Sequence, residues 1–187
     1  DDKYPGYEDA VGKIAQYALR YSEEKKLSIV IAGKRDIGNE LELFQTTDTE
    51  TSWYKKYIGD SLKITPRIRN KFTTYDLIDR SRISLAFVST ALSEGVSRGN
   101  RVLFCNFSKH SVFNFPVNGL MSLTTDNYEE FSSRVTKILG YTDFEYNDKV
   151  SSASKYIMNT NDLISTSNAL KEIISQAIQN KKVSNVK

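Results

Sequence analysis

The stretch ISLAFVSTALSEGVSRGNRVLFCN, residues 83–106, decides the fold. Two apolar runs, 83–89 and 101–106, flank a short polar segment that ends near Gly99. Continuous apolar runs of this length are typical of strands buried on both faces, and a Gly commonly ends a helix. We therefore predict a strand, a helix over 91–99 and a second strand, the unit from which an α/β domain with a parallel sheet is built.

The same alternation continues on both sides of this stretch. Apolar residues at helical spacing predict helices over 7–25, from an Asp126 cap to Gly140 and over 161–180. Further helices are expected around Glu50–Ile58, over 74–80 with Thr73 as its cap, and over 143–157. Short apolar runs predict strands at 27–33, at 61–65 before Pro66 and at 120–124. We expect one domain over 1–187 with a frayed tail at 181–187. Its sheet should have five or six mostly parallel strands, of which 27–33, 83–89 and 101–106 are central.

The composition is that of an ordinary globular domain. The chain has 187 residues, and its net charge of +3, from 26 basic and 23 acidic residues, is too small to indicate a nucleic-acid partner. A single Cys excludes an internal disulfide and fits a reducing compartment, and a single His excludes a His/Cys zinc site within the chain. No apolar run approaches the roughly 20 residues that span a membrane.

Parallel sheets of this kind bind ligands at the carboxyl ends of their strands. The segments that leave the predicted strands carry a glycine, four cations and a hydroxyl pair: Gly33, Lys34, Arg35, Arg67, Arg69, Ser89 and Thr90. A helix N-terminus has unpaired N–H groups and a partial positive charge, so hydroxyls beside it can help to bind phosphate. The other interpretation of the hydroxyl pair is an ordinary helix cap, and the cations can equally be solvated loop residues.

Glu94 distinguishes this segment from a capping box. It stands four residues after Thr90 and five after Ser89, whereas a capping box needs a spacing of three. A carboxylate repels phosphate but can accept hydrogen bonds from the two hydroxyls of a ribose. The pattern favours a nucleotide with phosphate and ribose side by side; the alternative is a solvated first-turn glutamate favoured by the helix dipole.

Other residue types add less. The sequence has no G-x-G-x-x-G and no G-x-x-x-x-G-K-[ST], so neither a dinucleotide fingerprint nor a P-loop is supported. We interpret His110 as a loop histidine, with general acid–base work as the second interpretation, and Cys105 as an inert core residue.

Three motifs carry a resemblance to a known family. They are S-T-x-x-x-E-G at Ser89–Gly95, R-G-x-x-V-L-F at Arg98–Phe104 and F-P-V-x-G-L at Phe115–Leu120. Together they resemble the C-terminal half of GT-B-type glycosyltransferases of bacterial surface-carbohydrate biosynthesis, related in pattern to capsule-polysaccharide Kdo and sialic-acid transferases. The resemblance covers roughly residues 50–155. It implies a Rossmann-like three-layer α/β/α domain, and because such enzymes have two domains, we expect this chain to be a piece of a longer protein.

The resemblance also implies a site. Donor phosphate would lie at Ser89 and Thr90 and ribose at Glu94, and the nucleotide-binding set would be Gly33, Lys34, Arg35, Arg67, Ser89, Thr90, Glu94 and Gly95. The chain departs from the family where a His-Pro pair is expected, because 32–36 reads Ala-Gly-Lys-Arg-Asp. Either Lys34 or Arg35 replaces the histidine, or the site is altered or inactive. No catalytic residue is assigned.

The implied activity is an inverting transfer from a nucleotide sugar, with CMP as the preferred nucleotide. No D-x-D pair is present to hold a metal, and no cofactor is expected. The implied partners are the nucleotide sugar, an N-terminal acceptor domain and an acceptor at the membrane surface or linked to a lipid. The implied location is the cytoplasm, including the inner face of the membrane. The alternatives are a nucleotide-sugar epimerase-like domain and a non-catalytic α/β interaction module.

Overall fold

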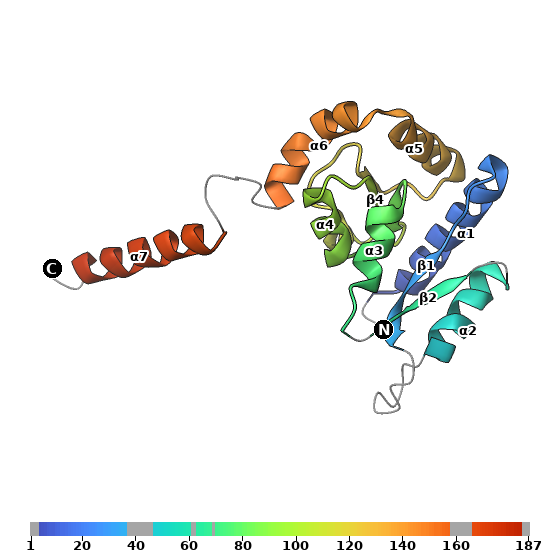
Figure 1. Cartoon of the computed structure of the whole chain (residues 1–187), viewed down its shortest axis with the longest axis horizontal. Coiled ribbons are helices and arrows are strands. Elements are labelled where there is room, and N and C mark those ends of the chain that lie inside the picture. Colours follow the sequence, from blue (N-terminus) through green and yellow to red (C-terminus); the bar gives the residue numbers. More distant parts are fainter. Residues whose placement is uncertain (1–3, 37–46, 61–62, 69, 158–165, 185–187) are drawn as a thin grey trace.

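The computed structural model describes residues 4–36, 47–60, 63–68, 70–157 and 166–184 (Figure 1). In chain order its elements are α1 (Tyr7–Lys25), β1 (Ile31–Asp36), α2 (Thr47–Ile58), β2 (Ile64–Arg67), α3 (Thr73–Arg80), β3 (Ser84–Ala86), α4 (Thr90–Ser97), β4 (Val102–Cys105), a 3-10 turn (Ser111–Phe113), β5 (Ser122–Leu123), α5 (Tyr128–Gly140), α6 (Asp143–Ile157) and α7 (Thr166–Ser184). The alternation confirms the predicted α/β class. Within these ranges, no helix is both long and apolar enough to cross a bilayer.

The strands form two small parallel sheets. One has the order β3-β4-β5, and the other pairs β1 with β2. The expected single sheet of five or six strands is therefore wrong for the described strands. Of the three strands predicted to be central, only β4 has a neighbour on both sides, whereas β3 is an edge and β1 belongs to the separate pair.

Strand β4 is the centre of the core. Val102, Leu103 and Cys105 have no exposed surface. Every backbone N–H in such a strand needs a partner, because an unpaired buried donor is costly. The first one, on Val102, donates to the hydroxyl of Tyr146 from α6 at 3.0 Å. Further along, the Phe104 N–H donates to a backbone oxygen of the β5 segment at 2.8 Å.

Pro66 lies inside β2, although we expected it to end that strand. Proline has no N–H to donate, so it is tolerated at sheet edges and irregularities. The β1–β2 register is regular at Ile31 and Ala32 and then shifts before Asp36 pairs with Arg67. The proline thus falls at this irregularity, and the strand continues for one residue beyond it. The apolar run from 27 to 30 precedes β1 rather than belonging to it.

Some helices have the bounds predicted from the sequence, whereas others begin or end at a different residue. The helices predicted over 7–25 and 143–157 are confirmed as α1 and α6. The cap of α5 is Asn127, whose side chain accepts the Glu130 N–H at 2.9 Å, because Asp126 instead binds Lys13 and Tyr17 of α1. The last helix, α7, extends to Ser184, past its expected end at 180.

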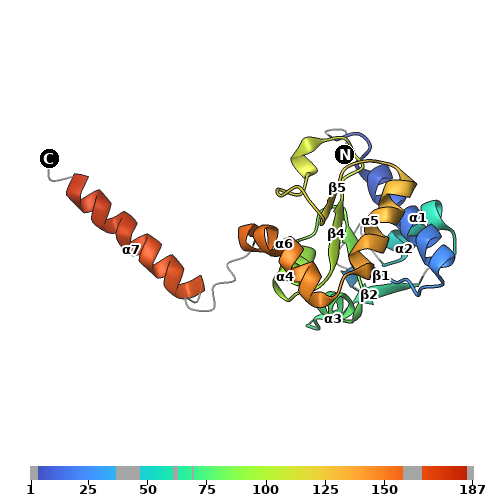
Figure 2. The same cartoon turned by 90° about the horizontal axis from the view of Figure 1, so that it is seen from above.

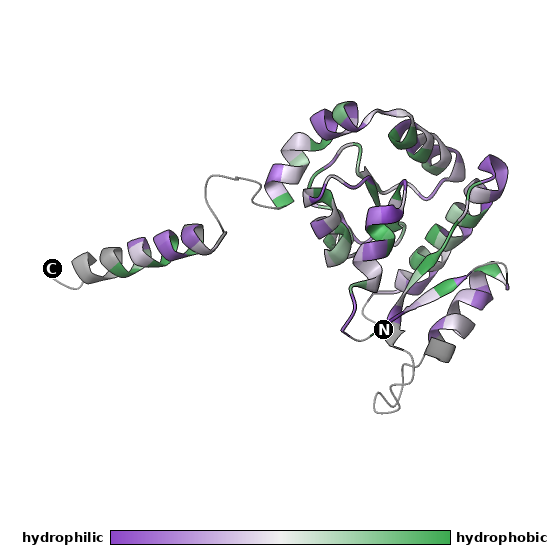
Figure 3. Ribbon diagram, in the orientation of Figure 1, coloured by the Kyte–Doolittle hydropathy of each residue, from purple (hydrophilic) through white to green (hydrophobic). Residues whose placement is uncertain are grey.

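Two groups of helices lie on opposite sides of the β3-β4-β5 sheet, α1 with α5 and α4 with α6, while α2 and α3 contact the β1–β2 pair (Figure 2). Helix α1 contacts α2 and α5, while α4 contacts α3 and α6. Figure 2 shows β4 and β5 between α1 and α5 on one side and α4 and α6 on the other. Helix α7 lies apart from both groups and carries apolar as well as polar residues (Figure 3). Its exposed apolar side chains are Leu170, Ile173, Ile174 and Ile178.

The contact between α1 and α2 depends on Gly12. A Cβ there would lie 2.2 Å from a ring carbon of Tyr57, so no side chain fits unless the ring moves. Overpacking a well-filled contact costs typically about 1–3 kcal/mol, more than the roughly 1 kcal/mol that Ala gains over Gly within a helix. We expect Gly12→Ala to lower the free energy of unfolding measured in urea.

The control for this prediction is the same substitution in a Tyr57→Ala background. Removing the ring removes the clash, so Gly12→Ala should there be neutral or stabilising. An equal loss in both backgrounds would show that Tyr57 does not determine the need for glycine.

Two tyrosines, the half-buried Tyr54 and the buried Tyr146, predict a loss of stability at alkaline pH. Burial, followed by the charge of Glu50, raises the pKa of Tyr54 to about 12, and burial also raises the pKa of Tyr146. The folded state therefore holds these phenolic protons more tightly than the unfolded chain, whose tyrosines titrate near about pH 10. The stabilisation is complete below about pH 10 and is lost as the pH rises toward 12.

Urea unfolding at pH 8, 10 and 11 measures this effect. We expect the free energy of unfolding of Tyr54→Phe to fall less between pH 8 and 11 than that of the unsubstituted chain. The prediction fails if the two fall in parallel.

Candidate functional site

Ser89 forms the N-terminal cap of α4. Its extended backbone, with φ −154° and ψ 119°, places Oγ to accept a hydrogen bond from the Leu92 N–H at 3.2 Å. The structure thus shows for Ser89 the ordinary capping role that the sequence had left as an alternative. Thr90 follows as the first residue of α4 and is exposed. Of the hydroxyl pair, Thr90 is therefore the one placed to meet a ligand.

Glu94 of α4 is hydrogen-bonded to a residue of the neighbouring helix, α3. Its Oε2 accepts a hydrogen bond from the hydroxyl of Tyr75, on α3, at 2.5 Å. This hydrogen bond is the main reason that the pKa of Tyr75 is raised. Glu94 is half-buried rather than solvated, and one of its oxygens is already committed to a phenol.

A second set of polar contacts fixes the ring of Tyr75. The guanidinium of Arg98 lies 4.9 Å from the ring centroid, a cation–π contact. Asp79 accepts hydrogen bonds from Asn100 at 2.7 Å and from Arg98 at 3.0 Å. These two bonds, that from Asn100 first, lower the pKa of the Asp79 carboxyl. Tyr75 is therefore held both at its hydroxyl and over its face.

The residues around Gly33 lie within β1 rather than beyond its end. The backbone N–H of Lys34 donates to both carboxylate oxygens of Glu50, at 2.9 and 3.1 Å. A Cβ on Gly33 would lie 3.0 Å from the backbone of Pro66, so glycine permits the close approach of β1 to β2. Arg35 also belongs to β1, but its side chain is outside the described part of the chain.

Gly95 also has a packing role. A Cβ at this position would lie 3.1 Å from Cγ2 of Ile78, on α3, so the glycine lets α3 and α4 pack closely. Arg69, one of the four expected cations, lies outside the described residues. Of the predicted set, Arg67 ends β2 and lines a cavity.

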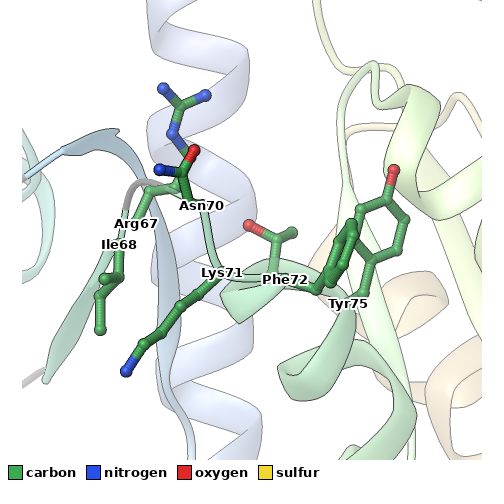
Figure 4. Close-up of a pocket in the computed structure, with 7 residues that line it drawn as sticks. Arg67, Ile68, Asn70, Lys71, Phe72 and Tyr75 are labelled. Carbon is green, nitrogen blue, oxygen red and sulfur yellow. The ribbon is translucent and has the colours of Figure 1, made fainter.

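That cavity lies where β2 leads into α3 (Figure 4). Its volume is about 360 Å³. Its lining residues are Arg67, Ile68, Asn70, Lys71, Phe72, Thr74 and Tyr75. Two of them are cationic, two are aromatic and none is acidic. The cavity therefore combines the features that bind a phosphate with those that bind a flat apolar group.

The turn at Asn70 shapes the cavity. Its φ of 62° is in the left-handed region, which Asn adopts more readily than most residues. Just beyond it, the Thr73 hydroxyl accepts a hydrogen bond from the Ile68 N–H at 3.3 Å and so ties the loop to the start of α3. Thr73 is consequently not the helix cap that we expected. Phe72 occupies the cap position and gives no side-chain cap.

His110 and Cys105 have structural positions. The Nε2 of His110 lies 3.0 Å from the carbonyl oxygen of Pro5, and its ring contacts Tyr4 edge to face. Cys105 is fully buried, and burial raises the pKa of its thiol. In the described ranges, no three His, Cys, Asp or Glu side chains cluster closely enough to hold a metal ion.

Most of the cavity was not predicted. Of its lining residues only Arg67 was among the predicted site residues, and Asn70, Lys71, Phe72 and Tyr75 were not. The signal was present in RIRNKF, residues 67–72, where cations, an Asn and a Phe directly follow a predicted strand. A cation next to an aromatic ring at the carboxyl end of a strand is typical of a ligand site.

Comparison with protein families, with curated proteins and with solved structures finds no match to this chain. The resemblance to glycosyltransferases therefore stays a prediction from the quoted motifs.

The hydroxyls of Ser89 and Thr90 should differ in how much they contribute to the stability of the fold. Replacing a capping Ser by Ala typically costs about 1 kcal/mol, so Ser89→Ala should lower the free energy of unfolding by about that amount. Thr90→Ala, at an exposed position, should change it by less than about 0.5 kcal/mol. Urea unfolding of both variants tests this, and equal losses would contradict the assignment of the cap to Ser89.

Proposed function

We propose that this chain is the nucleotide-sugar-binding domain of a glycosyltransferase of bacterial surface-polysaccharide biosynthesis, with the nucleotide in the cavity between β2 and α3. The observation that carries the proposal is the lining of that cavity. Arg67 and Lys71 supply positive charge, and Phe72 and Tyr75 supply aromatic rings. A nucleotide has both a phosphate and a flat base, and so matches both features.

The arrangement of the elements supports the Rossmann-like three-layer part of the proposal. Parallel strands with helices on both sides place their ligand sites at the carboxyl ends of the strands. Arg67 is the last residue of β2, so the cavity begins at the carboxyl end of a strand of the two-stranded β1–β2 sheet. We take this layering as that of the C-terminal half of a GT-B fold, in agreement with the motifs at 89–95, 98–104 and 115–120.

Phosphate fits the cationic end of the cavity. Arg67 and Lys71 can make charge-assisted hydrogen bonds to its oxygens, which are about twice as strong as neutral ones. In a transfer reaction the same groups would stabilise the phosphate that leaves the sugar. The acceptor and the catalytic base would come from the N-terminal acceptor domain of the parent protein, and transfer would proceed with inversion.

Glu94 adjoins this cavity through Tyr75. Because the Tyr75 hydroxyl binds Oε2, a ribose can reach Glu94 only through the other carboxylate oxygen or by displacing the phenol. Ser89 is committed as a cap, so the earlier placement of phosphate at Ser89 and Thr90 now depends on Thr90 alone. A loss of nucleotide affinity in Thr90→Ala would support that placement.

Calorimetric titration with CMP, UDP, GDP and ADP tests the proposal. We expect weak binding with CMP ahead of UDP. Lys71→Ala removes one charge-assisted contact, worth about 1.5–3 kcal/mol, and should weaken CMP binding roughly tenfold or more. The matched control is Lys137→Ala, an exposed lysine on α5, which should bind CMP like the unsubstituted chain.

Two results would overturn nucleotide-sugar binding as the function, and a third would overturn the cavity as its site. One is the absence of heat for all four nucleotides, which would favour a non-catalytic interaction module. The other is heat for ADP alone, which is not the base preference of the proposed donors. Equal loss of affinity in Lys71→Ala and Lys137→Ala would place the nucleotide outside the cavity.

A further inference from the structure

Phe72 exposes a large apolar ring to solvent. The residue is 75% exposed, and the neighbouring Ile68 is 42% exposed. Both line the cavity that Arg67 and Lys71 make cationic. An exposed aromatic ring beside cationic side chains is a common feature of sites for nucleic acids, whose bases stack on the ring.

Phe72 also occupies a position that local structure does not favour. It is the N-cap of α3, where Ser, Thr, Asn and Asp are strongly preferred because their side chains bond the first N–H groups. No side-chain cap is made, and the adjacent Thr73 hydroxyl is turned back to the Ile68 N–H. Neither helix capping nor core packing therefore accounts for a Phe here.

The ring has a fixed neighbour. Phe72 and Tyr75 meet edge to face, with centroids 6.0 Å apart and planes at 66°. Tyr75 is itself held by Glu94 at its hydroxyl and by Arg98 over its face. Figure 4 shows the two rings side by side, with Arg67 and Asn70 at the other end of the cavity. The ring pair is thus supported before any ligand binds, and the two cations of the cavity lining, Arg67 and Lys71, point away from it (Figure 4).

We propose that Phe72 is the stacking residue for the nucleobase, and that Tyr75 is a positioning residue for its ring. This inference rests on the proposed function and adds the orientation of the ligand. The base lies on Phe72, and the phosphate lies toward Arg67, Asn70 and Lys71. The ligand class is therefore a nucleotide recognised through its base, rather than a sugar phosphate recognised through its phosphate alone.

The experiment compares CMP with ribose 5-phosphate, which keeps the sugar and phosphate but has no base. Calorimetry is carried out on the unsubstituted chain, on Phe72→Leu and on Phe144→Leu. Phe144 is the matched control because it is 83% exposed on α6. Base–aromatic stacking is worth about 1–3 kcal/mol, so Phe72→Leu should weaken CMP binding between about fivefold and about 140-fold. It should leave ribose 5-phosphate unaffected, and Phe144→Leu should affect neither ligand.

A second variant gives an independent readout. Phe72→Trp keeps a stacking ring and should retain CMP affinity, and its fluorescence should be quenched by CMP but not by ribose 5-phosphate. Trp53 is the single Trp of the chain, so Phe144→Trp, which carries the same Trp53 background, serves as the reference.

The outcomes separate the two proposals. If no nucleotide binds the unsubstituted chain, both the proposed function and this inference fail. If CMP binds but Phe72→Leu binds it equally well, or loses CMP and ribose 5-phosphate to the same degree, the nucleotide site stands and the stacking role of Phe72 is wrong. Thermal unfolding of each variant shows whether a loss of binding reflects a loss of the fold.

Discussion

The burial of β4 is the constraint on which the rest of the domain depends. A strand without solvent must have every backbone donor and acceptor paired, and its partners are drawn from distant segments. β3 and β5 pair with its two edges, and the hydroxyl of Tyr146 reaches from α6 to the N–H of Val102. From α5, the Arg134 guanidinium donates hydrogen bonds to the carbonyl oxygens of Gly119 and Ser122, both at 2.7 Å, and so fixes the short β5. The sheet is small, and side chains from α5 and α6 complete it.

The candidate site depends on this core without belonging to it. Helices α3 and α4 pack against each other across Gly95, and that contact brings Tyr75 to Glu94. The loop from β2 to α3 is then shaped by the left-handed turn at Asn70 and by the hydroxyl of Thr73. Charge and aromatic surface therefore meet in a loop whose two ends are held by regular structure, which is where ligand-binding residues are commonly found.

Local patterns in the sequence predict the helices better than the sheet. The helices at 7–25 and 143–157 were predicted with their observed bounds, because many apolar residues at one spacing all point to the same answer. The division into two sheets could not be predicted, because it depends on which edges meet and not on how apolar each run is. Runs such as 83–89 are also longer than the strands they contain: β3 covers only Ser84–Ala86, and beyond it Phe87 is buried while Val88 is exposed.

In the candidate site, too, local interactions could be predicted and contacts between distant residues could not. Capping by Ser89 is a local interaction and was among the alternatives, and the cationic end of β2 followed from the position of strand ends. The bond between Glu94 and Tyr75 joins residues 19 apart in sequence on two helices. Nothing in the spacing of either residue indicates the other. The exposure of Phe72 and its place at a helix N-terminus are known only from the structure.

The burial of Cys105 has a practical consequence. It is the single cysteine of the chain, and a thiol without solvent contact, held protonated, reacts poorly with alkylating reagents and oxidants. A cysteine introduced at an exposed position would therefore be the one reactive thiol of the folded molecule. Spin labels or fluorophores could be attached there without first removing the natural residue, and the domain itself should be insensitive to thiol oxidation.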